Sequence, residues 1–441
     1  MMEINAILKR IGISELSVMQ KDSYSAILNT NKDLVVLSPT GTGKTLAYML
    51  ALTELIDPDD SNVQALVIVP GRELALQSDT VLKNMGTNIS SVSCYGGRPT
   101  MDEHRIIKKK HPQIMFGTPG RLNDHIDKGN ISVYGIKYLV IDEFDKCLEM
   151  GFHNEMSRLF KSLPGVRRRI LLSATDADQI PEFVKIANVI RLDYINRENE
   201  VKQRITFYVV NSPIKDKLET LNRMLCSFGA QSSIVFLNYR ESVERVSGYL
   251  SAKGFIVAAF HGGLEQRQRE DALYKFGNGS ANVLVTTDLA SRGIDIQGVD
   301  NIIHYQLPNG KDEYTHRIGR TARWKSEGNV FFILGPNENM PDYVEEEPCE
   351  YSIGEVLPST PPQPQMKTLY IGKGKKDKIS KGDIVGFLCK KGGLASDDIG
   401  QIDLKERYTY VAIRNGSAEH ILEAVSGEKI KGIKTVVEFI K

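Results

Sequence analysis

With 441 residues, of which 41% are hydrophobic and 25% charged, the chain has enough apolar side chains for a core, which argues against an intrinsically disordered protein. Its five cysteines lie far apart and form no C-x-x-C pair, so neither a disulfide framework nor a cysteine-based zinc site is expected. No stretch approaches the roughly 18 apolar residues that a membrane span needs, and the first residues show no secretory pattern. We therefore expect a protein of the reducing cytoplasm with about three domains.

Short apolar runs alternate with amphipathic helical stretches over most of the chain. The runs occur at residues 33–38, 64–70, 113–119, 137–142 and 168–175, and again at 232–237, 255–260, 282–287, 301–307 and 329–334. Runs of this kind between helical segments are typical of buried parallel strands in βαβ units. We therefore predict two tandem α/β domains, residues 1–196 and 205–357, with ligands at the carboxyl ends of the strands.

The segment SPTGTGKT, residues 38–45, directly follows the first apolar run. It matches the phosphate-binding pattern G-x-x-x-x-G-K-[ST], except that a serine replaces the first glycine. Its glycines let backbone N–H groups point at phosphate oxygens, its lysine would reach the β and γ phosphates, and its last threonine would ligate Mg²⁺. The alternative is a plain Gly/Ser/Thr turn. The expected nucleotide-binding residues are Ser38, Thr40, Gly41, Thr42, Gly43, Lys44 and Thr45.

Three carboxylates follow the run at 137–142, in the segment VIDEFDK. A carboxylate at the end of a strand can hold the magnesium ion of a nucleoside triphosphate, which suits Asp142. A second one beside it can orient and deprotonate the attacking water, which suits Glu143. Asp145 is too far along the chain to share that metal face easily and is expected to pair with another loop. The alternative is a solvated acidic helix start, since acidic residues favour helix N-termini.

Taken in order, these motifs resemble those of the DEAD-box ATP-dependent RNA helicases over most of residues 16–335. In the first half the matching motifs are SVMQ, SPTGTGKT, PGRELA, the glycine pair at 96–97, TPGR, DEFD and SAT. In the second half they are IVFLNYR, QRQR, TTDLASRGID and HRIGRTAR. The resemblance implies two RecA-like domains, ATP and Mg²⁺ as cofactors, and RNA as the partner. Phe144 departs from the family, which has alanine there.

The resemblance also implies a role for each matching position. Nucleotide contacts outside the phosphate loop are expected from Gln20 and Asp295. Hydrolysis is expected to be coupled to unwinding through Asp145, Ser173, Thr175, Asp288 and His316. The RNA strand is expected to contact Arg72, Gly97, Thr118, Arg121, Gln266, Arg269, Thr287 and Arg292.

Two arginines of the motif HRIGRTAR, Arg320 and Arg323, are candidates for stabilising the transferred phosphoryl group. Negative charge spreads over the γ oxygens in the transition state, and a guanidinium from a second domain can raise the rate about 10³- to 10⁵-fold. With Lys44, Asp142 and Glu143 they complete the expected catalytic set. Bound ATP would then hold the two domains together until it is hydrolysed. On composition alone, the arginines could instead form a solvated face.

Charge and composition change towards the C-terminal end. Residues 366–441 carry 15 Lys and Arg against 10 Asp and Glu, a net +5, so residues 1–365 carry −4 of the total +1. The preceding stretch has neither Lys nor Arg at residues 326–366, and its segment LPSTPPQPQ favours an extended spacer. We therefore predict a third, separate domain at residues 366–441.

This third domain reads strand, helix, two strands, helix, strand, which is the order of an RRM-like α+β module. Its segments GKGKKDKISKGDIVG, IGQID and KIKGIK resemble the C-terminal RNA-binding domain of DbpA-type bacterial helicases. This resemblance implies a structured element of large-subunit ribosomal RNA as target and a role in ribosome assembly. Tyr370, Tyr408 and Tyr410 lie where such modules place stacking aromatics, but a half-buried sheet face explains them equally well. The candidate RNA contacts, which could also serve solubility alone, are Lys375, Lys376, Lys378, Lys381 and Arg407.

We expect an RNA-stimulated ATPase that acts as a monomer and separates short duplexes locally, because contacts to the RNA backbone position a strand without reading its sequence. Two other functions stay open. A DNA-acting helicase of the same superfamily would be stimulated by DNA and not by RNA. A clamp or scaffold would close on RNA with ATP without productive unwinding, although the intact Glu143 and both arginines disfavour it.

Overall fold

The computed structural model describes residues 4–39, 41–97, 99–175, 180–195, 204–288, 298–321, 327–354, 360–418 and 420–440. The chain divides into two compact units. The first comprises residues 1–204 with 291–295 and 312–323, and the second comprises 205–290, 296–311 and 324–441. Within the described ranges, no helix is both long and apolar enough to cross a membrane.

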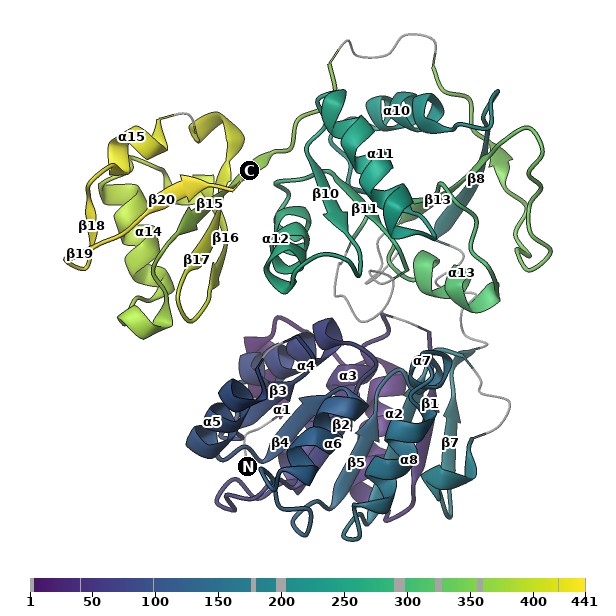
Figure 1. The fold of residues 1–441 in the computed structure, drawn as a ribbon, viewed down its shortest axis with the longest axis vertical. Coiled ribbons are helices and arrows are strands. Elements are labelled where there is room, and N and C mark those ends of the chain that lie inside the picture. The colour runs from purple at the N-terminus through teal and green to yellow at the C-terminus, as the bar shows by residue number, and fades with distance from the viewer. Residues whose placement is uncertain are drawn as a thin grey trace. The chain divides into compact units, whose positions relative to one another are not determined.

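A seven-stranded parallel sheet forms the centre of the first unit (Figure 1). Most of its strands are short, buried apolar runs, as predicted for strands that are buried on both faces. In spatial order they are β3 (Ser91–Cys94), β4 (Ile114–Gly117), β2 (Ala65–Ile68), β5 (Tyr138–Ile141), β6 (Arg168–Ser173), β1 (Leu34–Leu37) and β7 (Ile190–Asp193). Because β6 lies between β1 and β5, the loops after these three strands leave the sheet side by side.

Helices cover both faces of this sheet, because alternate side chains of each strand enter two separate cores. In β1, Val36 packs into one core, whereas Val35 and Leu37 pack into the other. The first core is covered by α1 (Ile4–Arg10), α2 (Val18–Asn29), α3 (Lys44–Leu55) and α4 (Arg72–Met85). The second is covered by α5 (Thr100–Lys110), α6 (Pro119–Asp127), α7 (Phe144–Glu149) and α8 (His153–Lys161), with the short helix η1 (Glu182–Val184).

The second unit contains another seven-stranded parallel sheet. Its strands, in spatial order, are β10 (Val257–Phe260), β11 (Val283–Thr286), β9 (Ser233–Phe236), β12 (Asn301–His304), β13 (Gly328–Leu334), β8 (Ile205–Asn211) and β14 (Cys349–Glu350). The helices of this unit that lie between its strands in the chain are α10 (Leu218–Ser227), α11 (Arg240–Ala252) and α12 (Gln266–Gly277). Helix α13 (Lys311–Ile318) follows β12 in the chain, but residues 312–318 of it belong to the first unit. The two sheets confirm the predicted pair of parallel-sheet domains.

A small α+β domain completes the second unit. Its sheet is antiparallel, in the order β16 (Ile399–Leu404), β17 (Thr409–Arg414), β15 (Met366–Ile371) and β20 (Val437–Phe439). One face of the sheet packs on α14 (Lys381–Lys390) and α15 (Ile421–Val425). Short elements complete it: η3 (Lys375–Asp377), η4 (Ser396–Asp398), η5 (Asn415–Ser417), β18 (Lys429–Ile430) and β19 (Ile433–Lys434). This is the predicted RRM-like order with one added hairpin, β18–β19.

Arg168, the first residue of β6, ties the first sheet to the end of helix α2. Its buried guanidinium donates to the carbonyl oxygens of Ile27 and Thr30, to that of Ala26 at 2.8 Å, and to the Thr30 hydroxyl at 3.0 Å. The last carbonyls of a helix have no partner within the helix, and a cation there is favourable. Arg168 therefore holds the helix whose first turn carries Gln20.

Replacing Arg168 by alanine is expected to loosen α2, because several buried carbonyl groups lose a charged donor. Protection of the α2 amides against hydrogen exchange should fall about 100-fold, equivalent to about 3 kcal/mol. The matched control is Arg169→Ala. The Arg169 guanidinium lies 3.9 Å from the Asp33 carboxylate, and its side chain is 20% exposed. It should change protection about tenfold or less. Equal effects of both variants would contradict the assigned role of Arg168.

Candidate active site

In the loop after β1, the lysine side chain folds back and binds the backbone of the same loop. The Lys44 ammonium donates to the carbonyl oxygen of Ser38 and, at 2.9 Å, to that of Pro39. The Ser38 hydroxyl donates to Thr42 Oγ1 at 2.8 Å, and Thr42 donates to the Pro39 carbonyl at 2.9 Å. Gly41 has a φ of 83°, in the left-handed region that favours glycine. Thr40, also predicted for this loop, lies outside the described residues.

Gln20 lies directly against this loop. Its Nε2 donates to the carbonyl oxygen of Gly43 at 3.2 Å, and its Oε1 accepts from the Ser17 N–H at 2.8 Å. The second bond belongs to a capping box that starts α2. Gly43 has a φ of 82°, in the left-handed region that favours glycine, and a Cβ atom there would come within 2.2 Å of Gln20 Nε2, so a side chain at this position would displace Gln20. The structure therefore brings Gln20 to the predicted nucleotide-binding loop.

The carboxylate of Asp142 faces the same loop from the end of β5. Its Oδ2 accepts from the Thr45 hydroxyl at 3.0 Å and from the Tyr48 hydroxyl at 3.2 Å. A hydroxyl and a carboxylate oxygen are ligands that Mg²⁺ prefers, so this pair fits the ion that accompanies a nucleoside triphosphate. Phe144 packs into the apolar core with Cys147 and removes none of these groups.

Glu143, the next residue, combines a strained backbone with a perturbed acid. Its φ of 54° is in the left-handed region, which is uncommon for a residue other than glycine. Burial, helped by the neighbouring charge of Asp142, raises the pKa of Glu143 to about 7, while the Arg320 guanidinium opposes this shift. Burial also raises the pKa of Asp142, against the opposing charge of Lys44. A carboxyl group with a pKa near neutrality suits a general base.

Asp145 does not contact the phosphate loop with Asp142 but pairs with the loop after β6. Its Oδ2 accepts from the Thr175 hydroxyl at 2.9 Å and the Thr175 N–H at 3.3 Å, while Ser173 donates to the Thr175 carbonyl at 2.6 Å. Nε2 of His316 lies 3.6 Å away. Burial alone would raise the pKa of Asp145, but the His316 ring and the Thr175 hydroxyl hold this pKa well below its usual range. Burial lowers the pKa of His316 to about 4, so its ring is neutral at pH 7.

Comparison with known proteins identifies the family to which a chain with this phosphate loop and these carboxylates belongs. Residues 17–183 match the DEAD/DEAH box helicase family, and residues 216–325 match the helicase conserved C-terminal domain. The chain is 33% identical to the ATP-dependent RNA helicase DbpA of Escherichia coli, over 98% of this chain and 96% of that protein. For DbpA of Bacillus subtilis the identity is 32%, over 96% and 95%. The chain belongs to the DEAD-box ATP-dependent RNA helicases.

Two further matches cover the tail and the fold. Residues 368–439 match the DbpA RNA binding domain, which extends the family assignment to the C-terminal end of this helicase. Among solved structures, that of Dbp5 from S. cerevisiae, bound to RNA and ADP BeF3, aligns with a TM-score of 0.68 and 29% identity, over 75% of this chain and 88% of that one. Like its family, the helicase uses ATP, hydrolyses it and binds RNA.

The predicted RNA contacts of the first unit come from neighbouring loops. A Cβ atom at Gly97, which has a φ of 93°, would lie 2.7 Å from Arg72 Nη1, so the guanidinium passes close over this glycine. The N–H of Thr118 donates to the Cys94 carbonyl at 3.3 Å, which joins the loops after β3 and β4. Arg121 follows on α6 and donates to the Thr100 hydroxyl at 2.6 Å. The structure therefore gathers Arg72, Gly97, Thr118 and Arg121 in one region.

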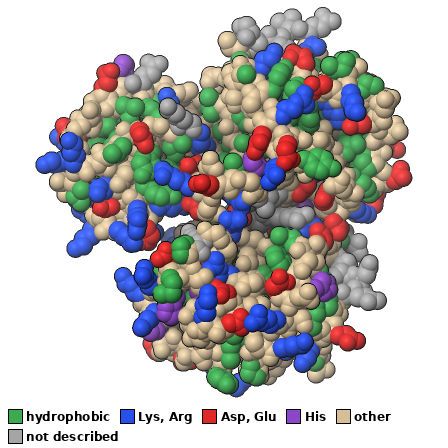
Figure 2. Space-filling view, viewed as in Figure 1, with side chains coloured by type: hydrophobic (Ala, Val, Ile, Leu, Met, Phe, Trp, Pro, Cys, Tyr) green, Lys and Arg blue, Asp and Glu red, His purple; other side chains and the backbone are tan. Residues whose placement is uncertain are grey.

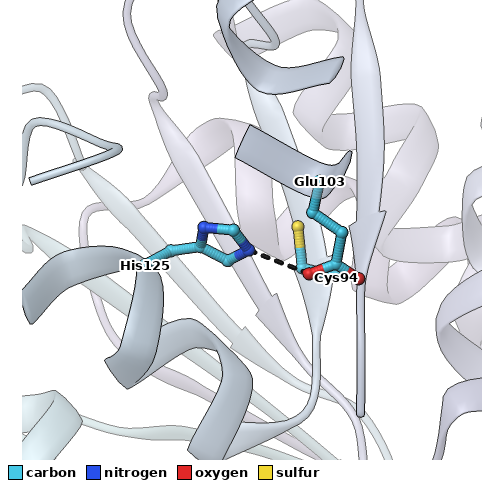
Figure 3. Close-up of side chains that lie close together, drawn as sticks. All are labelled: Cys94, Glu103 and His125. Atoms are coloured by element: carbon cyan, nitrogen blue, oxygen red, sulfur yellow. Dashed lines mark hydrogen bonds and ion pairs between the residues drawn. The ribbon is translucent and has the colours of Figure 1, made fainter. Parts of the chain in front are cut away.

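A buried carboxylate, Glu103 on α5, connects these loops (Figure 3). It accepts from the N–H of Tyr95 at 3.1 Å and from His125 Nε2 at 2.9 Å, and it lies 3.6 Å from the Arg121 guanidinium. The Asn130 amide donates to the other ring nitrogen of His125, so Nε2 carries the proton. Cys94, Glu103 and His125 each offer one potential metal-ligand atom, and these three atoms lie within 4.8 Å of one another. The hydrogen bonds of Glu103 and His125 instead form an ordered polar network.

The remaining predicted residues of the helicase fold lie in different parts of the chain. Gln266 and Arg269 lie on α12, where Arg269 donates to the carbonyl of Gly262 at 2.6 Å and that of Leu264 at 3.2 Å. Thr287 and Asp288 directly follow β11. Arg320 is buried after α13, and its Nε donates to the His316 carbonyl at 3.4 Å. Three other predicted residues, Arg292, Asp295 and Arg323, lie outside the described ranges.

In the C-terminal domain, two turns bring three of the predicted basic residues together. The N–H groups of Lys375 and Lys376 each donate at 2.9 Å, to the carbonyl oxygens of Lys405 and Glu406. Arg407 follows in the same turn, so it lies beside the two lysines. All five candidates, at positions 375, 376, 378, 381 and 407, are exposed, and Figure 2 shows Lys and Arg side chains on the visible face of this domain.

Sequence reasoning missed four side chains that organise the site. Tyr48 could have been suspected, because it lies one helical turn after Lys44 on the same face of α3. Arg168 is one of three consecutive arginines, and nothing in the sequence distinguishes it from its neighbours. Glu103 and His125 belong to no motif. Their partnership depends on the pairing of β3 with β4, which brings α5 and α6 together.

The raised pKa of Glu143 predicts a pH-dependent turnover. The ionised carboxylate is the expected base, so RNA-stimulated kcat should fall as the pH falls through about 7, the value to which burial raises the pKa of Glu143. Glu143→Gln should lower kcat by about 10²- to 10⁴-fold and remove this acid limb, because an amide cannot accept the proton. The measurement is steady-state ATP hydrolysis from pH 5.5 to 9 under saturating RNA. A flat profile in the parent enzyme would contradict the assignment.

The Glu103 network predicts a positioning role in RNA binding. In Glu103→Gln, a neutral amide faces the His125 N–H and no longer attracts Arg121, so the RNA concentration for half-maximal ATPase activity should rise about tenfold. ATP binding without RNA should not change. The matched control is Asp102→Asn on the same helix, whose side chain is 59% exposed and should have no effect. An unchanged RNA requirement in Glu103→Gln would rule out this role.

Proposed function

We propose that this helicase separates short RNA duplexes locally and that its C-terminal domain directs it to structured large-subunit ribosomal RNA during ribosome assembly. The observation that carries the proposal is the exposed basic cluster around Lys375, Lys376 and Arg407, within a segment that matches the DbpA RNA binding domain. The proposal includes a monomer in the cytoplasm, with three domains at residues 1–196, 205–357 and 366–441.

In the proposed reaction, the loop at Ser38–Thr45 binds the phosphates of ATP. The hydroxyl of Thr45 and the carboxylate of Asp142 would hold Mg²⁺, which neutralises phosphate charge when bound. Glu143 accepts a proton from the attacking water, and its pKa of about 7 lets it do so near neutral pH. Arg320 and Arg323 stabilise the charge that develops on the γ oxygens.

The pairing of Asp145 with Thr175 supports a route from hydrolysis to unwinding. The strand order places the loop after β6 between the phosphate loop and the carboxylates. Thr175 therefore contacts both Ser173 and Asp145 beside the expected catalytic groups. A change at the γ phosphate would reach this loop through Asp145 and its neighbour Glu143. We assign coupling to these residues, with Asp288 and His316 as further members.

The two parts of the enzyme bind RNA for different purposes. Contacts from Arg72, Thr118 and Arg121, with Gln266, Arg269, Thr287 and Arg292 as further candidates, would be made to the sugar-phosphate backbone, which positions a strand without reading sequence. Exposed lysines on a folded domain add charge and shape complementarity to one structured RNA. The helicase domains would then act on any RNA strand within reach, and the C-terminal domain would determine the RNA to which the enzyme binds.

The basic cluster is tested by the charge-reversal variant Lys375→Glu/Lys376→Glu/Arg407→Glu in the full chain. ATPase activity is measured with a panel of ribosomal RNA fragments and with unstructured RNA. The parent should prefer one fragment, and the variant should lose this preference while it keeps stimulation by unstructured RNA. The salt dependence of binding, as log K against log salt, should become shallower by about three.

The matched control is Lys390→Glu, which removes an exposed lysine at the far end of α14. It should keep the fragment preference of the parent. Equal preference in the parent, the control and the charge-reversal variant would refute a targeting role for the cluster. A parent enzyme that responds to all fragments equally would refute the ribosomal RNA target itself.

A further inference from the structure

Helix α3 presents two hydroxyl groups to one carboxylate. Thr45 and Tyr48 are three positions apart, which places them on the same face of the helix. The Thr45 hydroxyl donates to Asp142 Oδ2 at 3.0 Å, and the Tyr48 hydroxyl donates to the same oxygen at 3.2 Å. The helix that follows the phosphate loop is therefore joined to the end of β5 through this carboxylate.

The other oxygen of Asp142 has a donor as well. Oδ1 accepts from the N–H of Glu143 at 3.1 Å, and the backbone N–H of Asp142 donates to the Ile68 carbonyl of β2 at 2.9 Å. The bond to β2 fixes the position of the residue, and donors on both carboxylate oxygens oppose rotation of the carboxylate. Tyr48 thus supplies one of three hydrogen bonds that set the orientation of the Asp142 carboxylate.

The two hydroxyl groups differ in exposure. Thr45 is partly exposed, and its oxygen is itself an expected ligand of Mg²⁺. Tyr48 is 0% exposed and belongs to the first core of the sheet. Because Tyr48 has no exposed surface, it does not touch a nucleotide or an ion at the phosphate loop. Its hydroxyl acts on the reaction only through Asp142.

The alternative is that this hydroxyl contributes to folding alone, because a buried tyrosine hydroxyl needs an acceptor wherever it lies. Tyr194 is such a case in the same core. It is 8% exposed, and its hydroxyl donates to Asp22 Oδ2 on helix α2. Tyr48 differs from Tyr194 in its acceptor, which is the carboxylate expected to bind the metal ion.

We propose that Tyr48 is a positioning residue, which holds the Asp142 carboxylate in the orientation in which it binds Mg²⁺. This inference rests on the proposed function of Thr45 and Asp142 as the metal-binding pair. Groups that hydrogen-bond a metal ligand orient it, and their removal weakens metal binding about 10- to 100-fold. A phenylalanine at position 48 would fill the same core but leave Oδ2 with one hydroxyl donor in place of two.

Tyr48→Phe tests this role, because it removes the hydroxyl and keeps the ring. The Mg²⁺ concentration that half-saturates the complex of the enzyme with mant-ADP is read from the fluorescence of the nucleotide. It should rise about tenfold in the variant, while the affinity for mant-ADP in excess EDTA should stay within about twofold of the parent. Equal Mg²⁺ requirements in the parent and Tyr48→Phe would overturn the proposal.

The matched control is Tyr194→Phe, which removes a hydroxyl from a different carboxylate in the same core. It should leave the half-saturating Mg²⁺ concentration unchanged, because Asp22 is not an expected metal ligand. An increase as large as that in Tyr48→Phe would show a general effect of losing a buried hydroxyl and would overturn the specific role of Tyr48.

Turnover at two Mg²⁺ concentrations provides a second readout. At the concentration that half-saturates the parent, the RNA-stimulated kcat of Tyr48→Phe should be about fivefold lower than that of the parent, as follows from a tenfold weaker metal site. At saturating Mg²⁺ it should return to within about twofold of the parent. A misfolded fraction would stay inactive at any Mg²⁺ concentration, so a loss that Mg²⁺ does not restore would contradict positioning.

Asp142→Ala distinguishes a failure of this inference from a failure of the proposed metal site. The half-saturating Mg²⁺ concentration should rise about 100-fold in Asp142→Ala, and adding Tyr48→Phe should change it less than about twofold, because Tyr48 acts through this carboxylate. An unchanged value in Asp142→Ala would refute the metal site itself. A shift in Asp142→Ala without one in Tyr48→Phe, or full additivity of the two changes, would refute only the role of Tyr48.

Discussion

Burying four charged groups at one edge of a sheet requires that they compensate one another. Lys44, Asp142, Glu143 and Asp145 are all at most 8% exposed, and an unpaired buried charge would cost several kcal/mol. Lys44 offsets Asp142, Asp145 turns to Thr175, and Glu143 remains with a pKa of about 7. The arrangement depends on parallel strands that end together, because only then do loops distant in sequence share one desolvated edge. The raised pKa of Glu143 and the contacts of Lys44 with its own loop both follow from this burial.

The sequence was most informative where chemistry is local. A glycine-rich loop after a strand needs only its own residues to present N–H groups and a lysine, so Lys44 and Thr45 could be placed without the fold. Asp142 could be placed because it ends a strand whose apolar run is unmistakable. The partner of Asp145 followed from the family resemblance, and the contact with Thr175 agrees with it. The two parallel sheets and the RRM-like order were likewise predicted from runs and spacing.

Pairings between distant elements could not be predicted in the same way. Glu103 and His125 are separated by a strand and meet only when β3 and β4 pair. Arg168 contacts carbonyls about 140 positions earlier in the chain, and any of three arginines could have done so. A strand such as β3, with the sequence SVSC, lacks the apolar run that marked the others, although all four residues are buried. Burial by neighbours, not local composition, determines these cases.

The sheet of the C-terminal domain carries Tyr370, Tyr408 and Tyr410 side by side, and these residues fit two interpretations until their neighbour is known. Aromatic residues on a sheet face favour base stacking if the face is free and packing if it is covered. The deciding residues lie on α12, where a charge of each sign and a tyrosine follow helical spacing. Polar partners for every tyrosine hydroxyl or ring make the face specific for that helix. Because the basic turns at Lys375 and Arg407 carry their charge on exposed side chains, the domain can keep this contact and still present positive charge to RNA.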